Sequence, residues 1–232
     1  AKLYADIFIN PTWRYCLAHA DAIALEGRWG NEQRILQIFG VGREKTFIIP
    51  VAVDVSFIRE RVKWAKLRRE DLGVGSQDFV FISVNAFHPV KGISYLVDAF
   101  KIVHKQMRNT KLIIIGSTSG TLGKSVYKRV IRQIVNYRLK DSVICLKDVP
   151  EELLYAYYAL ADCYVSPTFN DDFIMSIAEA MACGLPIVST GQDFLVKPGK
   201  NGYIVPRGKP QENSGKPFSL NRSSRGRLHP YP

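Results

Sequence analysis

The fold is decided by residues 79–116, FVFISVNAFHPVKGISYLVDAFKIVHKQMRNTKLIIIG. The segment begins with the apolar run Phe79–Val84, and a second apolar run, Leu112–Ile115, lies near its end. Between them, apolar residues recur at steps of three and four from Ile93 to Met107, which predicts a helix with one buried face. Strands that are apolar along their whole length, joined by an amphipathic helix, are typical of a parallel sheet covered on both faces.

The same alternation continues toward the C-terminus. It predicts further strands at 142–146, 163–166, 186–189 and 203–205, and helices at 126–135, 150–160 and 175–183. Gly184 is suited to close the last helix, and Asp148 is a candidate N-cap for the helix that begins near Pro150. The expected fold is therefore α/β, a doubly wound, Rossmann-like parallel sheet. Ligands of such sheets bind beyond the carboxyl ends of the strands, here at residues 85–91, 116–124, 147–150 and 166–174.

The first 55 residues have a different pattern. Strands are predicted at 20–25 and 46–50, with a helix at 31–39 between them, and this piece is too small to be an independent domain. We interpret residues 1–55 as the end of a preceding domain and the crossing that leaves it, and residues 56–206 as the sheet domain. Residues 207–232 are rich in Ser, Arg, Pro and Gly, so we expect a disordered basic tail.

The chain is basic, with 32 Lys and Arg against 21 Asp and Glu in 232 residues, a formal net charge of +11. From Arg207 onward there are six basic residues and one acidic residue, so +5 of that charge lies in the tail, and residues 59–69 carry much of the rest. Two interpretations stay open: a solvated helix face with a loose end, or a peripheral contact with a membrane surface or another polyanion. Aromatic residues are not interleaved with these charges, so we expect no nucleic acid partner.

Four cysteines, Cys16, Cys145, Cys163 and Cys183, lack CxxC spacing and histidine partners. This distribution argues against a zinc site or a disulfide framework and favours a reducing compartment. No apolar run is long enough to span a bilayer, and the N-terminal residues lack the order of a signal peptide. The expected location is cytoplasmic.

Acidic residues flank the start of the helix predicted at 175–183. Asp171 precedes it and Glu179 lies two turns inside, so both carboxylates can lie toward the same side as the first amides. Free amides at a helix start favour a phosphate, and carboxylates accept hydrogen bonds from sugar hydroxyls. A nucleotide sugar offers both groups. The alternative is that Asp171 and Asp172 only cap the helix while Glu179 faces water.

The run DDFIMSIAEAMACGLP, residues 171–186, resembles the Glu-x7-Glu signature of the family 4 glycosyltransferases, which have the GT-B fold. Further motifs resemble the same family in the same order. Residues 20–25 resemble the last strand of the family's first domain, and residues 49–54 resemble its interdomain crossing. Residues 84–92 resemble its loop with a donor-phosphate lysine. The family's order of motifs is completed by residues 149–153, 161–162 and 166–167. The resemblance covers roughly residues 20–206 and makes residues 56–206 the donor-binding domain.

By this resemblance the chain would bind a nucleoside diphosphate sugar and transfer the sugar to a carbohydrate or lipid-linked acceptor, with retention and without a metal or other cofactor. Lys91 would neutralise the diphosphate, Glu179 would accept hydrogen bonds from the ribose, and Asp171 would hold the transferred sugar. The backbone would supply the remaining donor contacts at Phe173, Ile174 and Met175 for the phosphate or sugar and at Lys147 and Val149 for the base. The turn that starts at Gly116 is either a phosphate loop or a plain flexible turn.

The sequence departs from the family pattern at the proposed site. Ala86 stands where the family has a second phosphate cation, Asp171 is one methylene shorter than the family's glutamate, and Ile174 replaces a glycine. Residues 51–52, Val-Ala, replace Asn-Gly at the crossing. Of the four histidines, only His88 lies in a loop at the expected binding edge.

Three functions therefore follow from the sequence. The first is a glycosyltransferase, present here mainly as its donor-binding half. The second is a noncatalytic module that binds a nucleotide sugar or serves as a scaffold, which the departures at Ala86 and Ile174 favour. The third is a basic surface-binding protein that uses the fold without its site. We also expect residues 1–50 to expose an apolar patch that promotes self-association.

Overall fold

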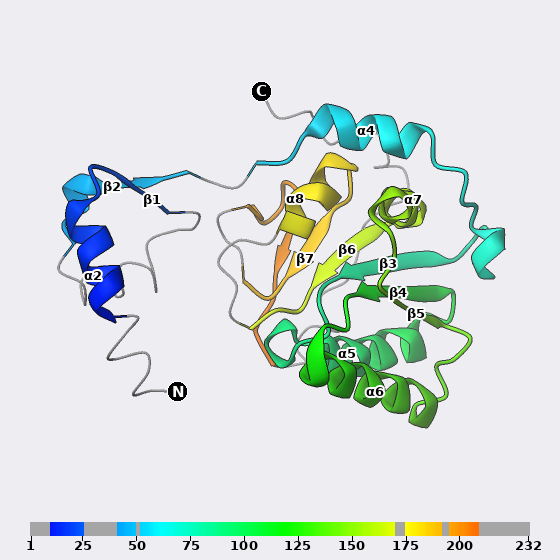
Figure 1. Ribbon diagram of the computed structural model, residues 1–232. Helices are drawn as coiled ribbons and strands as arrows, with labels where there is room; N and C mark the ends of the chain where they lie inside the picture. Colours follow the sequence, from blue (N-terminus) through cyan, green and yellow to red (C-terminus); the bar gives the residue numbers. More distant parts are fainter. Residues whose placement is uncertain (1–9, 26–40, 50–51, 170–174, 192–194, 209–232) are drawn as a thin grey trace. The chain divides into compact units, whose positions relative to one another are not determined.

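The computed structural model describes residues 10–25, 41–49, 52–169, 175–191 and 195–208 (Figure 1). The chain divides into two compact units, Ala1–Ala52 and Val53–Pro232. In the first unit, β1 (Ile23–Leu25) and β2 (Thr46–Ile48) pair in parallel, as expected for two strands in this region. Helix α2 (Asn10–His19) was not predicted from the sequence. The helix predicted at 31–39 lies outside the described residues.

The second unit is built on a parallel sheet of six strands (Figure 1). Their order across the sheet is β5-β4-β3-β6-β7-β8, and every neighbouring pair is parallel. The strands are β3 (Phe79–Val84), β4 (Thr110–Gly116), β5 (Val143–Lys147), β6 (Cys163–Ser166), β7 (Ile187–Ser189) and β8 (Gly202–Ile204). The predicted doubly wound α/β sheet is confirmed, with strand boundaries within two residues of those expected.

Helices cover both faces of this sheet (Figure 1). One face carries α5 (Ile93–Gln106) and α6 (Gly120–Asn136), and the other carries α4 (Val55–Lys63), α7 (Glu151–Leu160) and α8 (Met175–Ala182). The short 3-10 helices η3 (Glu70–Leu72) and η4 (Pro89–Lys91) complete the unit. Each face has its own apolar core, so the strands are buried on both sides as their composition predicted.

One residue of the basic stretch 59–69 belongs to the core rather than to a solvated face. The guanidinium of Arg69 lies 2.7 Å from the carboxylate of Asp162, and both side chains are largely buried. Arg69 also donates to the carbonyl oxygens of Asp78 and Leu160, at 3.0 and 2.8 Å. This ion pair ties the segment before β3 to the start of β6, because Asp162 also accepts a hydrogen bond from the amide of Val80.

The strand order reverses between β3 and β6. From β3 the chain adds β4 and β5 on one side, and it then returns through α7 to add β6, β7 and β8 on the other side. The loops that follow β3 and β6 therefore leave the same edge of the sheet and lead to helices on opposite faces, α5 and α8. A crevice at such a switch point is the usual ligand site of an open α/β sheet.

Candidate functional site

The two loops at the switch point are joined by direct hydrogen bonds. The amide of Phe169, after β6, donates to the carbonyl oxygen of Val90, after β3, at 2.8 Å, and the hydroxyl of Thr168 donates to the same oxygen at 3.3 Å. Gly92 has φ +66°, and a Cβ there would collide with the carbonyl oxygen of Pro167. Only glycine satisfies both conditions, so its position fixes how closely the loops approach.

Lys91 stands in the first of these loops, as the last residue of η4, and is half-buried. The turn that carries it is held by the amide of Lys91, which donates to the carbonyl oxygen of His88 at 3.0 Å. The ring of His88 accepts from the amide of Val90 at 3.4 Å, so this histidine caps the turn. The predicted diphosphate lysine therefore lies at the carboxyl edge, beside the start of the loop that leads to α8.

Glu179 lies in the second turn of α8, half-buried and facing α7. Its Oε2 accepts a hydrogen bond from the hydroxyl of Tyr158 at 3.1 Å. That hydroxyl also lies 3.3 Å from the carbonyl oxygen of Ser176, in the first turn of α8. The interpretation in which Glu179 simply faces water is thus wrong, because a fully buried tyrosine holds its carboxylate.

A second buried tyrosine connects α8 to the end of β3. The hydroxyl of Tyr164 donates to the carbonyl oxygen of Val84 at 3.1 Å and lies 2.6 Å from the hydroxyl of Ser176. Val84 is the last residue of β3, directly before the loop that carries Lys91. The two tyrosines therefore link the start of α8 and Glu179 to the base of the lysine loop.

Burial raises the pKa of the Glu179 carboxyl above its ordinary value. The hydrogen bond from Tyr158 acts in the opposite direction, and the nearby carboxylate of Glu151 adds to the increase. Burial also raises the pKa of both tyrosine hydroxyls, which stay protonated and able to donate. The hydrogen bond from Tyr158 therefore favours the charged form of Glu179, which is the form that accepts hydrogen bonds with both oxygens.

At β4 and β5 the structure explains Gly116 and corrects the prediction for Asp148. A Cβ at Gly116 would collide with the carbonyl oxygen of Asn85, so close backbone packing accounts for this glycine. Asp148 does not cap α7, whose N-cap is Pro150. Its backbone has φ +52°, and its carboxylate instead accepts from the amide and hydroxyl of Thr118, at 3.1 and 3.0 Å. The turn after β4 is thereby tied to β5.

The other predicted site residues are spread along the same edge. Lys147 ends β5 and is exposed, Val149 is half-buried on the α7 side, and Met175 opens α8 with 48% of its surface exposed. Asp171, Phe173 and Ile174 lie outside the described residues. The loop with Lys91 follows β3 and the helix with Glu179 follows β6, so both leave the carboxyl edge at the switch point, whereas Lys147 and Val149 lie at the end of the outermost strand, β5. Tyr158, Tyr164 and Ser176 were missed by the sequence reasoning.

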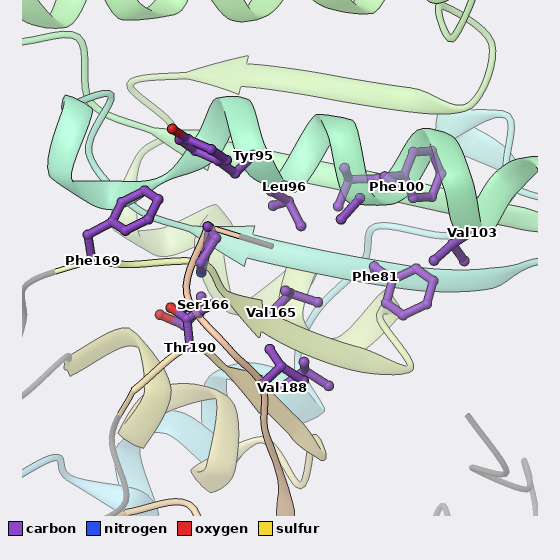
Figure 2. A pocket seen from close by; sticks show the side chains of 15 residues that line it. Phe81, Tyr95, Leu96, Phe100, Val103, Val165, Ser166, Phe169, Val188 and Thr190 are labelled. Carbon is purple, nitrogen blue, oxygen red and sulfur yellow. Dashed lines mark hydrogen bonds between the residues drawn. The ribbon is translucent and has the colours of Figure 1, made fainter. Parts of the chain in front are cut away.

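Two cavities border α5, and one of them is also lined by the lysine loop. The larger, about 450 Å³, lies beside η4 and the start of α5 and includes His88, Ser94 and Arg129 in its lining. The smaller, about 70 Å³, is apolar and lies between α5 and the sheet, where Figure 2 shows Tyr95 and Phe169 at one end and Phe81 and Val103 at the other. Neither cavity is lined by Lys91 or Glu179.

The described residues contain no cluster of three or more His, Cys, Asp or Glu side chains that would hold a metal ion. Across the same ranges, no helix is long and apolar enough to cross a membrane. All four cysteines are free thiols. Burial raises the pKa of Cys145 and Cys183 to about 12, so neither is a nucleophile near neutral pH.

Comparison with known proteins identifies the family. The family model described as glycosyl transferases group 1 matches residues 65–216, well over half of the chain. The chain belongs to this family. A relative in the family, the D-inositol 3-phosphate glycosyltransferase of Geodermatophilus obscurus, is 27% identical over 194 residues, which are 80% of this chain and 42% of the relative. An uncharacterized glycosyltransferase of Methanocaldococcus jannaschii is 25% identical over 81% of this chain and 44% of its own length.

Solved structures confirm the GT-B fold predicted from the resemblance. Sucrose-phosphate synthase from Thermosynechococcus elongatus matches with a TM-score of 0.71 and 22% identity, covering 88% of this chain and 50% of that one. Anabaena HepE, solved in complex with UDP and glucose, matches with a TM-score of 0.71 and 20% identity over 90% of this chain and 56% of its own. This glycosyl transferases group 1 chain therefore spans about half the length of its relatives. The narrower assignment to family 4 stays a prediction.

Proposed function

We propose that this chain is the donor-binding half of a retaining glycosyltransferase that uses a nucleoside diphosphate sugar. In this proposal the ammonium group of Lys91 and the first amides of α8 bind the diphosphate, Glu179 accepts hydrogen bonds from the ribose, and Asp171 holds the transferred sugar. The amides of Phe173, Ile174 and Met175, the backbone near Lys147 and Val149, and the turn at Gly116 complete the predicted contacts.

The observation that carries the proposal is the joining of the two loops at the switch point. The bond from Phe169 to Val90 holds the Lys91 turn against the start of the loop that leads into α8. The hydroxyls of Tyr158 and Tyr164 then fix α8 and Glu179 relative to the same strand end. A cation, a helix start and a carboxylate at the carboxyl edge of one sheet suit the three parts of a nucleotide sugar. The solved structure of Anabaena HepE contains UDP and glucose, which are a nucleoside diphosphate and a sugar, the two components of such a donor.

The chemistry follows from where charge develops. Transfer breaks the bond between the anomeric carbon and the diphosphate oxygen and forms a bond from that carbon to the oxygen of an acceptor hydroxyl, whose proton passes to the departing diphosphate. The leaving diphosphate gains negative charge as the bond breaks. A fixed ammonium group and helix amides stabilise that charge without a metal ion. The acceptor, a carbohydrate or a lipid-linked sugar, would be held by the other half of the enzyme.

A noncatalytic donor-binding or scaffold module is the second candidate. Ala86 stands, exposed, where a second phosphate cation is expected from the family pattern. Loss of one preorganised electrostatic contact commonly lowers the rate by about 10² to 10³. Binding without transfer would then be the outcome for this chain.

Calorimetric titration with UDP-, GDP- and ADP-sugars tests the proposal. We expect one of the three to bind, and we expect Lys91→Ala and Glu179→Ala each to abolish the binding. Matched controls are Lys105→Ala and Glu70→Ala, which remove one exposed charge of the same sign from the opposite edge of the sheet. Binding with sugar transfer supports the enzyme, binding without transfer supports the module, and no binding of any donor leaves only the scaffold.

The cellular setting and assembly are further proposals. The absence of CxxC spacing supports a cytoplasmic location, where the cysteines stay reduced. Self-association through the first unit is supported by the exposure of Trp13 and Tyr15 on α2, at 54% and 66%. Sedimentation that shows a monodisperse monomer would contradict self-association.

A further inference from the structure

Helix α6 is amphipathic, and all its charged side chains are basic. Its sequence, GTLGKSVYKRVIRQIVN, contains four cations and no Asp or Glu. The buried side, formed by Gly123, Val126, Val130 and Ile134, packs on the sheet. The apolar side chains therefore pack α6 on the sheet, whereas the cations are not part of this packing.

The cations all lie on the exposed side of the helix. Lys124, Lys128 and Arg132 follow one another at intervals of four residues, which at 1.5 Å per residue places them about 6 Å apart along one line. Arg129 lies next to this line, and all four side chains are exposed. In the part of the chain that the structure describes, none of the four forms an ion pair. We call these four residues the α6 basic face.

Neighbouring segments extend the positive charge. Further exposed cations on α5 and in the turns that follow both helices are Lys101, Lys105, Arg108, Arg138 and Lys140. Asp98 on α5 contacts the end of α6 through hydrogen bonds that it accepts from Gln133 and Tyr137, at 2.5 and 2.8 Å. By contrast, the three cations of α4 on the other face of the sheet, Arg59, Arg61 and Lys63, are balanced by Glu60 on α4 and by Glu151 and Glu152 on α7. The net positive charge of the helices therefore lies on the face formed by α5 and α6.

We propose that the α6 basic face binds the anionic headgroups of a phospholipid bilayer. A straight row of cations on a convex helix suits a flat array of negative charges. The same exposed side carries Leu122 and Val135, which are 51% and 42% exposed and suit the boundary between headgroups and acyl chains. It carries no aromatic side chain on which a nucleic acid base would stack, because Tyr127 instead contacts the ring of Phe87.

This surface has a consequence for the candidate donor site. Helix α6 is the next element after β4, so its N-terminal end, near Lys124, lies at the carboxyl edge of the sheet, as does the loop with Lys91. A bilayer bound along α6 would therefore come close to that edge, which suits an acceptor anchored in lipid. Only this consequence rests on the proposed function. The contact with lipid stands independently of donor binding.

Vesicle cosedimentation of the full chain tests the proposal. The vesicles are phosphatidylcholine alone, or phosphatidylcholine with about 30% phosphatidylglycerol, at low salt and at about 0.5 M salt. We expect binding only to the anionic vesicles, and we expect salt to weaken it. Replacing Lys124, Lys128 and Arg132 by Gln should weaken binding at least about tenfold, because each cation near an anionic surface contributes about fivefold.

The matched control replaces Arg59, Arg61 and Lys63 of α4 by Gln. It removes the same three charges from the opposite face of the sheet and should change binding by less than about twofold. Thermal unfolding checks that both triple variants remain folded. The proposal would be overturned if the two triple variants lost vesicle binding equally. It would also be overturned if the α6 variant kept its binding, which is the result expected if residues after Gly208 bind the vesicles. Tighter binding of an RNA oligonucleotide than of the vesicles, lost in the α6 variant, would also overturn it.

Discussion

Replacing Tyr158 by Phe isolates one hydroxyl of the candidate site. The ring is fully buried, so Phe preserves the packing and removes only the group that lies 3.1 Å from Glu179 Oε2 and 3.3 Å from the carbonyl oxygen of Ser176. A hydrogen bond to a charged group contributes about 1.5–3 kcal/mol. Because Glu179 is only half-buried, we expect the lower end of this range, which corresponds to about tenfold in donor affinity.

The pH dependence of donor binding separates this effect from general damage. The hydrogen bond from Tyr158 lowers the pKa of Glu179, whereas burial and Glu151 raise it. Without that bond the pKa rises further, so more of the carboxyl is protonated at a given pH. The affinity ratio of wild type to variant should therefore grow as the pH falls toward the pKa of Glu179.

Calorimetric titration of wild type and variant over a series of pH values measures this ratio. Tyr155→Phe is the matched control, because it removes a hydroxyl from the preceding turn of the same helix. Its donor affinity should follow the wild-type pH profile. A Tyr158→Phe ratio that stays constant across the pH series would refute the reasoning, since a purely structural loss has no such dependence.

Three stability predictions follow, each measured by urea denaturation. Gly92→Ala should cost about 2 kcal/mol or more, because it combines positive φ with a collision, whereas Gly199→Ala, with φ +77° and open space around it, should cost less. Arg69→Ala should cost about 3–5 kcal/mol by leaving a buried carboxylate unpaired, whereas Arg68→Ala, in an exposed pair, should change stability little. Burial holds the folded pKa of Glu179 above its ordinary value of 4.5, so folding favours the protonated carboxyl. This contribution to the free energy of unfolding is present below pH 4.5 and is lost as the pH rises through the folded pKa. Glu179→Gln should remove this pH dependence.

The sheet was predictable because its strands are apolar along their length. Residues 79–84 and 163–166 were predicted with the boundaries that β3 and β6 have. Helix α6 begins at Gly120, six residues before the predicted start, because its first turn contains glycines with weak helix propensity. Helix α2 was not predictable in this way because, of residues 11–19, only Leu17 is buried, so the segment has no apolar face of the kind that marks the other helices.

The candidate site was predictable only in part. The position of Lys91 and Glu179 at one edge followed from the parallel sheet and the family resemblance. The links through Tyr158 and Tyr164 did not, because their partners lie 12 to 80 residues away on other elements. For Asp148, a cap was the local expectation, but a contact with Thr118, 30 residues away, determines its conformation.

The central claim is that Lys91 and the start of α8 bind the diphosphate of a nucleotide. Its most direct test compares the affinities of a nucleoside monophosphate and the corresponding diphosphate, for wild type and Lys91→Ala. The base is that of the donor sugar that binds in the titrations above. We predict that wild type binds the diphosphate more tightly than the monophosphate and that Lys91→Ala removes this preference. Equal affinities of wild type for the two nucleotides, or an unchanged preference in the variant, would contradict the claim.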